Sequence, residues 1–152
     1  MKILVADGVS PKGIEILQKA GFETVIKDKL PAEELLEIIP DFDGLIVRSA
    51  SKVTKEVIER AKKLKIVGRA GVGTDNIDIN AATAHGIMVI NSPGGNTIAA
   101  TEHTMGMMMA MARNIAVANE TMQHGEWNRK KYTGVELRGK TLGVIGLGRI
   151  GS

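Results

Sequence analysis

Short apolar runs rich in β-branched residues alternate regularly with amphipathic stretches over the first 95 residues. Such runs predict buried strands, which the pattern places at 3–6, 24–26, 44–47, 65–67 and 87–90. Helical spacing of the apolar positions between them predicts four helices, at 11–20, 31–39, 55–64 and 79–85. Ser10 and Thr54 are expected N-caps, because their side-chain oxygens can accept hydrogen bonds from the free N–H groups of a first helical turn.

Strands that alternate with helices of this length predict βαβ units, whose strands are parallel and whose crossovers are right-handed. We therefore expect residues 1–96 to form an α/β domain with a flavodoxin-like, doubly wound parallel sheet. Ligands of such sheets bind outside the carboxyl ends of the strands. At those ends the sequence carries Asp7-Gly8, Arg48-Ser49, Arg69 to Gly73 and Asn91 to Asn96. This rim of arginines and amides can bind a small acid, and the alternative for the arginines is surface ion pairing.

The composition changes after this rim. Residues 97–122 contain no proline, one glycine and six of the eight methionines, and they predict one helix of about 20 to 25 residues. Its apolar positions spread around the axis, which indicates burial by more than one neighbour. We expect this helix to connect two domains, and its apolar surface favours a homodimer or a higher homo-oligomer. Residues 123–139 are polar and predict a loop or arm.

A Gly-x-Gly-x-x-Gly motif follows the last predicted strand, 141–145, at Gly146, Gly148 and Gly151. In a dinucleotide-binding turn the first glycine permits a tight turn, the second lets the backbone reach a pyrophosphate, and the third lets helix and strand pack closely. The motif favours the start of a Rossmann NAD-binding domain within residues 97–152, with a structural glycine-rich turn as the alternative. The acidic residue that binds the ribose is expected about 20 residues further on, so we expect the amino-terminal part of a longer polypeptide.

Four segments carry a resemblance to a known family: Val47–Ala50, Gly68–Asp78, Asn91–Thr97 and Arg138–Gly151. Together they resemble the NAD-dependent D-isomer-specific 2-hydroxyacid dehydrogenases, in order and register over essentially all 152 residues. The arm at 127–132 is most similar to the phosphoglycerate branch of that family. The resemblance implies oxidation of 3-phosphoglycerate to 3-phosphohydroxypyruvate, a step towards serine, with NAD as cofactor.

The resemblance also assigns residues to the site. Arg48 and Asn96 would hold the phosphate and carboxylate of the substrate, and Arg129 would reach a substrate in the neighbouring subunit. The other substrate-binding candidates lie beside the rim arginines: Ser49, Arg69, Ala70 and Gly71. The forked donors of an arginine suit an anionic pair of oxygens. The expected cofactor-binding residues are Val72, near the nicotinamide half, and the motif residues Gly146, Gly148, Arg149, Ile150 and Gly151.

No catalytic residue is expected within this chain. The family's catalytic His, Glu and Arg belong to the carboxyl-terminal part of its pattern, which is not among these residues. His85, His103 and His124 are expected to be structural or solvated. Glu102 precedes His103, but adjacent helical residues point in different directions and do not form a dyad. We therefore expect the chain alone to be inactive.

Composition and charge exclude several other classes. The sequence has no cysteine, so it offers no disulfide framework and no thiolate nucleophile, and no metal site is expected. The net charge is +3, but the basic residues are scattered, so nucleic-acid binding is not expected. The first residues turn polar too soon for a signal peptide or a membrane span, and we expect a cytoplasmic protein. Two alternatives stay open: another D-2-hydroxyacid dehydrogenase, and a non-catalytic, NAD-sensing interaction protein of the same fold.

Overall fold

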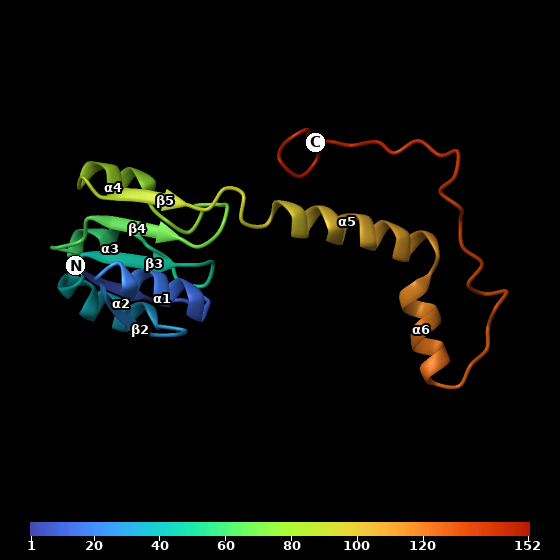
Figure 1. The fold of residues 1–152 in the computed structure, drawn as a ribbon, viewed down its shortest axis with the longest axis horizontal. Helices are drawn as coiled ribbons and strands as arrows, with labels where there is room; N and C mark the ends of the chain where they lie inside the picture. Colours follow the sequence, from blue (N-terminus) through green and yellow to red (C-terminus); the bar gives the residue numbers. More distant parts are fainter. The chain divides into compact units, whose positions relative to one another are not determined.

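The structure is a computed structural model that describes all 152 residues. The chain forms two compact units, Met1–Gly95 and Asn96–Ser152, which run from blue to yellow and from yellow to red in Figure 1. This division falls beside the predicted domain boundary at residue 96. The functions that the sequence suggests for the two parts stay predictions.

The first unit is built on one five-stranded parallel sheet (Figure 1). Its strands are β1 (Lys2–Val5), β2 (Glu23–Ile26), β3 (Gly44–Val47), β4 (Ile66–Arg69) and β5 (Met88–Asn91). The spatial order is β2-β1-β3-β4-β5 and every neighbouring pair is parallel. This is the flavodoxin-like order, and it confirms the predicted fold class.

Helices connect the strands at the positions that the apolar spacing predicts. They are α1 (Pro11–Lys19), α2 (Ala32–Ile38) with the short 3-10 turn η1 (Ile39–Asp41), α3 (Lys55–Arg60) and α4 (Ile79–Ala84). The hydroxyls of Ser10 and Thr54 accept from the backbone N–H groups of Gly13 and Val57. Both predicted N-caps are therefore confirmed.

Helix α3 is shorter than predicted, because it ends at Arg60 and does not continue to Leu64. The backbone of Ala61 turns away from helical geometry with ψ 71°, and its N–H group bonds to carbonyls one turn earlier. Ala61 and Leu64 are nevertheless buried. The periodic pattern thus identified core positions correctly, but an irregular segment supplies two of them.

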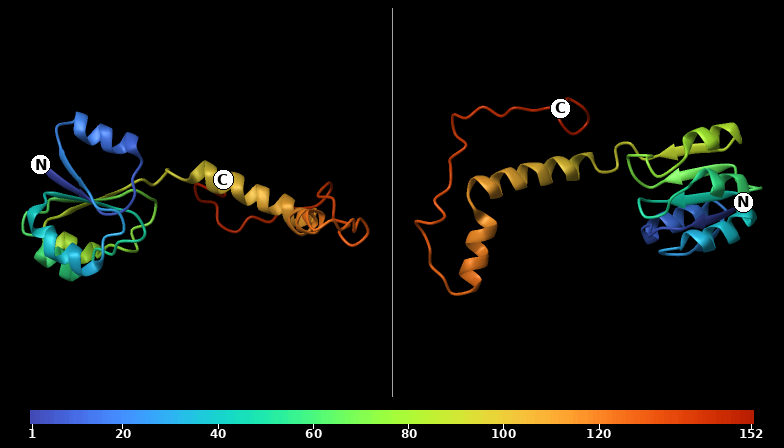
Figure 2. Two further views of the ribbon diagram at one scale, coloured as in Figure 1. Left: turned by 90° about the horizontal axis from the view of Figure 1, so that it is seen from below. Right: turned by 180° about the vertical axis from the view of Figure 1, so that it is seen from behind.

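The core lies mainly on one face of the sheet. Leu4, Leu45 and Val67 from the three central strands pack there with Leu35, Val57, Ile58 and Ala82 from α2, α3 and α4. Figure 2 shows these three helices on one side of the sheet and α1 alone on the other. On that second side an apolar groove runs beside α1, lined by Ile3, Ile46, Ile66 and Ile90.

The second unit contains two helices, α5 (Thr97–Ala112) and α6 (Ile115–Gln123). The prediction of one continuous helix is wrong, because Asn114 adopts the left-handed conformation with φ 52° and divides it. Asparagine tolerates this conformation better than most residues. Neither helix has a buried residue. None of the helices in the chain combines the length and the apolar character that crossing a membrane requires.

The predicted strand at 141–145 is also absent. These residues are exposed and irregular, and the side chain of Ile145 is fully exposed. A strand needs a neighbour to satisfy its backbone N–H and C=O groups. No strand occurs elsewhere in Asn96–Ser152, so the apolar run has no partner with which to form a ladder.

Candidate functional site

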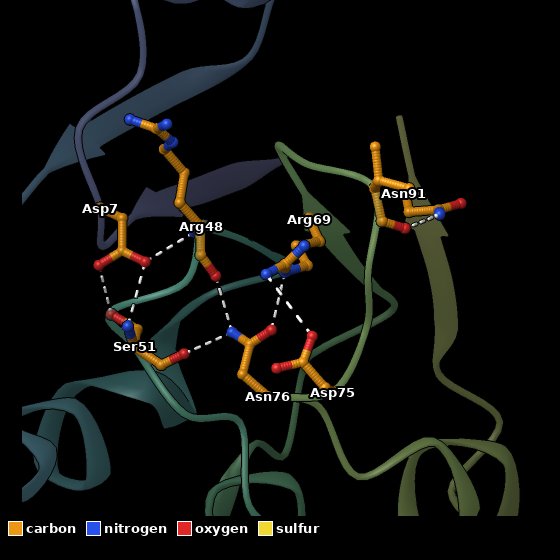
Figure 3. A network of polar contacts seen from close by, with 8 residues as sticks. Asp7, Arg48, Ser51, Arg69, Asp75, Asn76 and Asn91 are labelled. Carbon is orange, nitrogen blue, oxygen red and sulfur yellow. Dashed lines mark hydrogen bonds and ion pairs between the residues drawn. The ribbon is translucent and has the colours of Figure 1, made fainter. Parts of the chain in front are cut away.

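The carboxyl ends of four parallel strands meet at one edge of the first unit and carry the rim that the sequence predicts. In the register of the sheet, Val47 of β3 lies beside Arg69 of β4, and Arg69 lies beside Asn91 of β5. Asp7 follows β1, next to β3. Figure 3 shows Asp7 and Arg69 in one network of polar contacts, with Asn91 beside it.

Asp7 is the buried centre of that network. One carboxylate oxygen accepts from the backbone N–H groups of Arg48 (2.6 Å) and Ser51 (3.1 Å). The other accepts from the Ser51 hydroxyl at 2.8 Å. Burial disfavours the ionised form of Asp7, but these hydrogen bonds outweigh it and hold the pKa of the carboxyl below its usual value. Asp7 is therefore a fixed anion that organises the segment after β3.

Asn76 completes the network from the loop before α4. Its amide nitrogen donates to the backbone carbonyls of Arg48 (2.7 Å) and Ser51 (2.6 Å). Its amide oxygen accepts from Nε of Arg69 at 2.8 Å. Sequence reasoning placed Asn76 within a family motif but gave it no role. Its partners lie 7 to 28 residues away along the chain, so no local spacing could have revealed them.

The two rim arginines differ in accessibility. The Arg69 side chain is only 11% exposed, and it lies between Asn76 and the carboxylate of Asp75, 3.7 Å from the guanidinium. The Arg48 side chain is exposed, and its guanidinium makes one hydrogen bond, a 3.5 Å contact to the carbonyl of Gly8, and no ion pair. In Figure 3 it points away from the network, whereas the Arg69 guanidinium turns into it. Arg48 is thus the arginine whose donors are free for an anion.

The loop after β4 lies against Arg69. A Cβ atom on Gly71 would come within 2.9 Å of Nη1 of Arg69, so this position leaves little room for a side chain. Ser49, Ala70 and Val72 are exposed at the same rim. The first unit therefore gathers Arg48, Ser49, Arg69, Ala70, Gly71 and Val72, all of which were expected from the sequence, at one edge of the sheet.

The remaining candidates belong to the second unit. Asn96 stands at the N-cap position of α5, and its side chain makes no capping hydrogen bond. Arg129 is exposed in an irregular turn after α6. The Arg129 guanidinium forms no ion pair.

The glycine motif adopts the tight turn that its first residue was expected to allow. Gly146 has φ +96°, and a Cβ atom on Gly151 would overlap the carbonyl oxygen of Gly146. The N–H group of Ser152 bonds to the carbonyl of Gly148 at 3.1 Å, which closes one helical turn. A Cβ atom on Gly148 would meet only open space. A turn with bare backbone at the start of a helical turn fits a diphosphate, because its N–H groups can face the anion.

The histidines make contacts that are local to their helices. His85 and His124 each place Nδ1 near the carbonyl four residues earlier, at 2.9 and 2.8 Å. His103 is exposed on α5. None of the three forms an ion pair with a carboxylate.

The five-stranded parallel sheet and its connecting helices place the first unit in the α/β class of proteins. The family model described as "D-isomer specific 2-hydroxyacid dehydrogenase, catalytic domain" matches residues 3–134. The chain therefore belongs to the D-isomer-specific 2-hydroxyacid dehydrogenase family.

Particular relatives are similar over almost the whole chain. D-3-phosphoglycerate dehydrogenase of Archaeoglobus fulgidus is 54% identical over 151 residues, which are 99% of this chain and 29% of that protein. The solved structure of TT0316 protein from Thermus thermophilus is 33% identical with a TM-score of 0.92, over 99% of this chain and 50% of that one. NAD⁺-bound 3-phosphoglycerate dehydrogenase of Entamoeba histolytica is 38% identical with a TM-score of 0.78, over 99% and 48%. The chain thus spans less than a third of the first of these relatives and about half of the two solved chains.

Proposed function

We propose that the chain supplies the substrate-binding part of a NAD-dependent D-3-phosphoglycerate dehydrogenase. In this reaction the C2 hydroxyl of 3-phosphoglycerate becomes the keto group of 3-phosphohydroxypyruvate. The O–H proton leaves to a base, and the C2–H bond breaks as the hydrogen departs with its electron pair. Bound NAD would supply the acceptor for that hydride, with NADH as the second product. A place in serine biosynthesis follows from this choice of substrate.

The observation that carries the proposal is the exposed guanidinium of Arg48 on a backbone that is fixed at the rim. A doubly wound sheet binds its ligands at this edge. Arg48 offers unengaged donors to a phosphate or carboxylate, while Ser49, Ala70 and Gly71 leave backbone accessible beside it. Arg69 would act through its neighbours, since its guanidinium is already engaged.

The remaining residues are assigned by the same proposal. Asn96 would bind the substrate through its side-chain amide, which makes no capping hydrogen bond to α5. Arg129 would bind the substrate of a neighbouring subunit in a homodimer or larger homo-oligomer. Gly146, Gly148, Arg149, Ile150 and Gly151 would hold the NAD pyrophosphate, with Val72 towards the nicotinamide. The bare turn at Gly146 and Gly151 supports this placement. The cytoplasmic location stays a prediction from the sequence.

Calorimetric titration of the purified chain tests the substrate class. We expect 3-phosphoglycerate to bind at least about tenfold more tightly than D-glycerate, because a charge-assisted hydrogen bond to phosphate contributes about 1.5 to 3 kcal/mol. Arg48→Ala should abolish that preference. Arg60→Ala is the matched control, because Arg60 is an exposed arginine on α3, outside the rim.

The outcomes separate the alternatives. Equal binding of D-glycerate, D-lactate and 3-phosphoglycerate would favour another D-2-hydroxyacid dehydrogenase. Binding of NAD with no response to any of these acids would favour a NAD-sensing interaction protein. An Arg60→Ala loss as large as that of Arg48→Ala would show that general charge, and not the rim, governs binding.

A further inference from the structure

The segment from Arg48 to Ser51 is held from both sides by two side chains. At its first residue, the Arg48 N–H group donates to Asp7 at 2.6 Å while the Arg48 carbonyl accepts from Asn76 at 2.7 Å. Its last residue repeats the arrangement, since Ser51 donates through N–H and hydroxyl to Asp7 and accepts from Asn76 at its carbonyl. Both ends of this four-residue loop are therefore fixed, although the Arg48 side chain stays free.

Asn76 is also the link between the two rim arginines. Its amide group donates to the Arg48 carbonyl and accepts from the Arg69 Nε–H group. Figure 3 shows the amide between the two residues, with the Arg69 guanidinium drawn into the network. No buried side-chain nitrogen or oxygen in the chain lacks a hydrogen-bond partner.

We propose that Asn76 is a positioning residue that holds the Arg48 loop and the Arg69 side chain in one fixed arrangement, so that Arg48 meets its anion with little loss of freedom. The anion in question rests on the proposed function. A preorganised loop improves affinity because less conformational freedom is lost on binding. Asn76 contacts neither substrate nor cofactor in this role, and it acts only through the arginines.

The chemistry of the network requires an amide at this position. Two donors are needed for the carbonyls of Arg48 and Ser51, and one acceptor is needed for Arg69. A primary amide carries both on one planar group. An aspartate could still accept from Arg69, but its oxygens would face two carbonyl oxygens without a proton to share. The Asn76→Asp variant therefore separates the role at Arg69 from the role at Arg48.

Calorimetry on the full 152-residue chain tests the effect on binding with 3-phosphoglycerate as the probe. We expect Asn76→Ala and Asn76→Asp each to weaken binding about tenfold or more. Asp78→Ala is the matched control, because it removes the N-cap hydrogen bond from the Ala81 N–H group and touches neither arginine. It should lower stability as a lost cap does, yet bind the probe like the wild type. Unchanged binding by Asn76→Ala, or an equal loss in Asp78→Ala, would overturn the positioning role.

A second measurement needs no ligand. The Arg69 Nε–H proton should exchange slowly with water in the wild type, about tenfold or more faster in Asn76→Ala, and slowly again in Asn76→Asp and Asp78→Ala. NMR of the arginine Nε–H signals reads this directly. If the wild-type chain fails to bind 3-phosphoglycerate, the proposed function fails, and the exchange rates alone decide whether Asn76 fixes the Arg69 side chain. Slow Arg69 exchange in Asn76→Ala would overturn the inference in either case.

Discussion

The two units of the chain contain similar apolar residues and use them differently. In Met1–Gly95, Leu4, Leu45 and Val67 lie inside a closed layer between the sheet and three helices. In Asn96–Ser152 no residue is buried, and methionines such as Met111 remain exposed on α5. Apolar content alone therefore does not make a core. A core forms where the topology places a second element against the apolar face.

The arrangement of apolar positions explains the difference. On helices α2, α3 and α4 they recur on the side that packs against the sheet, so one neighbouring layer covers them. On α5 they surround the axis, and several neighbours would be needed to cover them. Helix α6 is the only other helix in that unit. It covers too little of α5 to bury any residue, and none of its own residues is buried. The comparison predicts that equal substitutions in the two units have unequal effects.

The largest contrast is expected from truncating one apolar side chain in each unit. Leu4→Ala should lower the free energy of unfolding by about 3 kcal/mol, because Leu4 is fully buried and its removal leaves a cavity. Met109→Ala on α5 should change it by less than about 0.5 kcal/mol, because Met109 is 49% exposed. Urea denaturation followed by circular dichroism measures both. Equal losses would mean that the second unit has a core of its own.

Acid should destabilise the first unit through Asp7. The pKa of Asp7 is lower in the folded chain than in the unfolded one. Its contribution to the free energy of unfolding is therefore complete above the unfolded pKa, about pH 4, and is lost as the pH falls through the folded pKa. Asp7→Asn should cost about 1 to 2 kcal/mol at pH 7. The variant should also lose less stability than the wild type as the pH falls below about 4, as urea midpoints measured at successively lower pH would show.

The control for this acid prediction is a carboxylate in the second unit. Glu102 is an exposed carboxylate on α5 with no ion pair. Glu102→Gln should therefore leave the urea midpoint unchanged at pH 7 and keep the wild-type acid dependence. Asp43 remains in both variants, and the Lys2 N–H group lowers its pKa, so some acid dependence persists. A pH profile of Asp7→Asn that is parallel to the wild type would show that Asp7 does not govern acid stability.

Backbone conformation offers a smaller contrast between the units. Gly86, after α4, and Gly146, in the glycine motif, both have positive φ, and a Cβ atom on either would meet nothing within 4 Å. Gly86→Ala should cost about 1 kcal/mol of unfolding free energy, because the left-handed conformation is strained for alanine. Gly146→Ala should have almost no effect on global unfolding, since no packed element depends on it. An equal shift of the urea midpoint in both variants would contradict this.

The sequence predicted what local periodicity and short motifs determine. The five strands, the caps at Ser10 and Thr54 and the rim position of Arg48 follow from residues that are near one another along the chain or at equivalent strand ends. It did not predict the role of Asn76, because an amide is polar in any loop until distant partners surround it. It also predicted a strand at 141–145 from apolar character alone, although strand formation depends on a pairing neighbour.

The break between α5 and α6 was also not predicted, and two features of the structure favour it. Asn114 supplies the left-handed residue. Independently, the N–H group of Val135 donates to the carbonyl of Ala112 at 2.7 Å, which occupies an acceptor that a continuous helix would use. A left-handed alanine costs about 1 to 2 kcal/mol, and a hydrogen bond of this kind contributes about 1 kcal/mol. The two contributions are comparable, so removing either one alone should not fully join α5 and α6 into one straight helix.

The smallest predicted effect tests this balance. Asn114→Ala should raise the helical content at residues 112–116 without changing the urea midpoint of the first unit, and NMR Cα shifts measure it residue by residue. Gly134→Ala should do the same through the other contact, because its Cβ atom would lie 2.5 Å from the Ala112 carbonyl oxygen and displace the segment that carries Val135. Asn114→Gly is the matched control, since glycine adopts the left-handed conformation freely. If Asn114→Ala keeps the break and Gly134→Ala removes it, the hydrogen bond from Val135 determines where α5 ends, and the local preference of Asn114 is incidental.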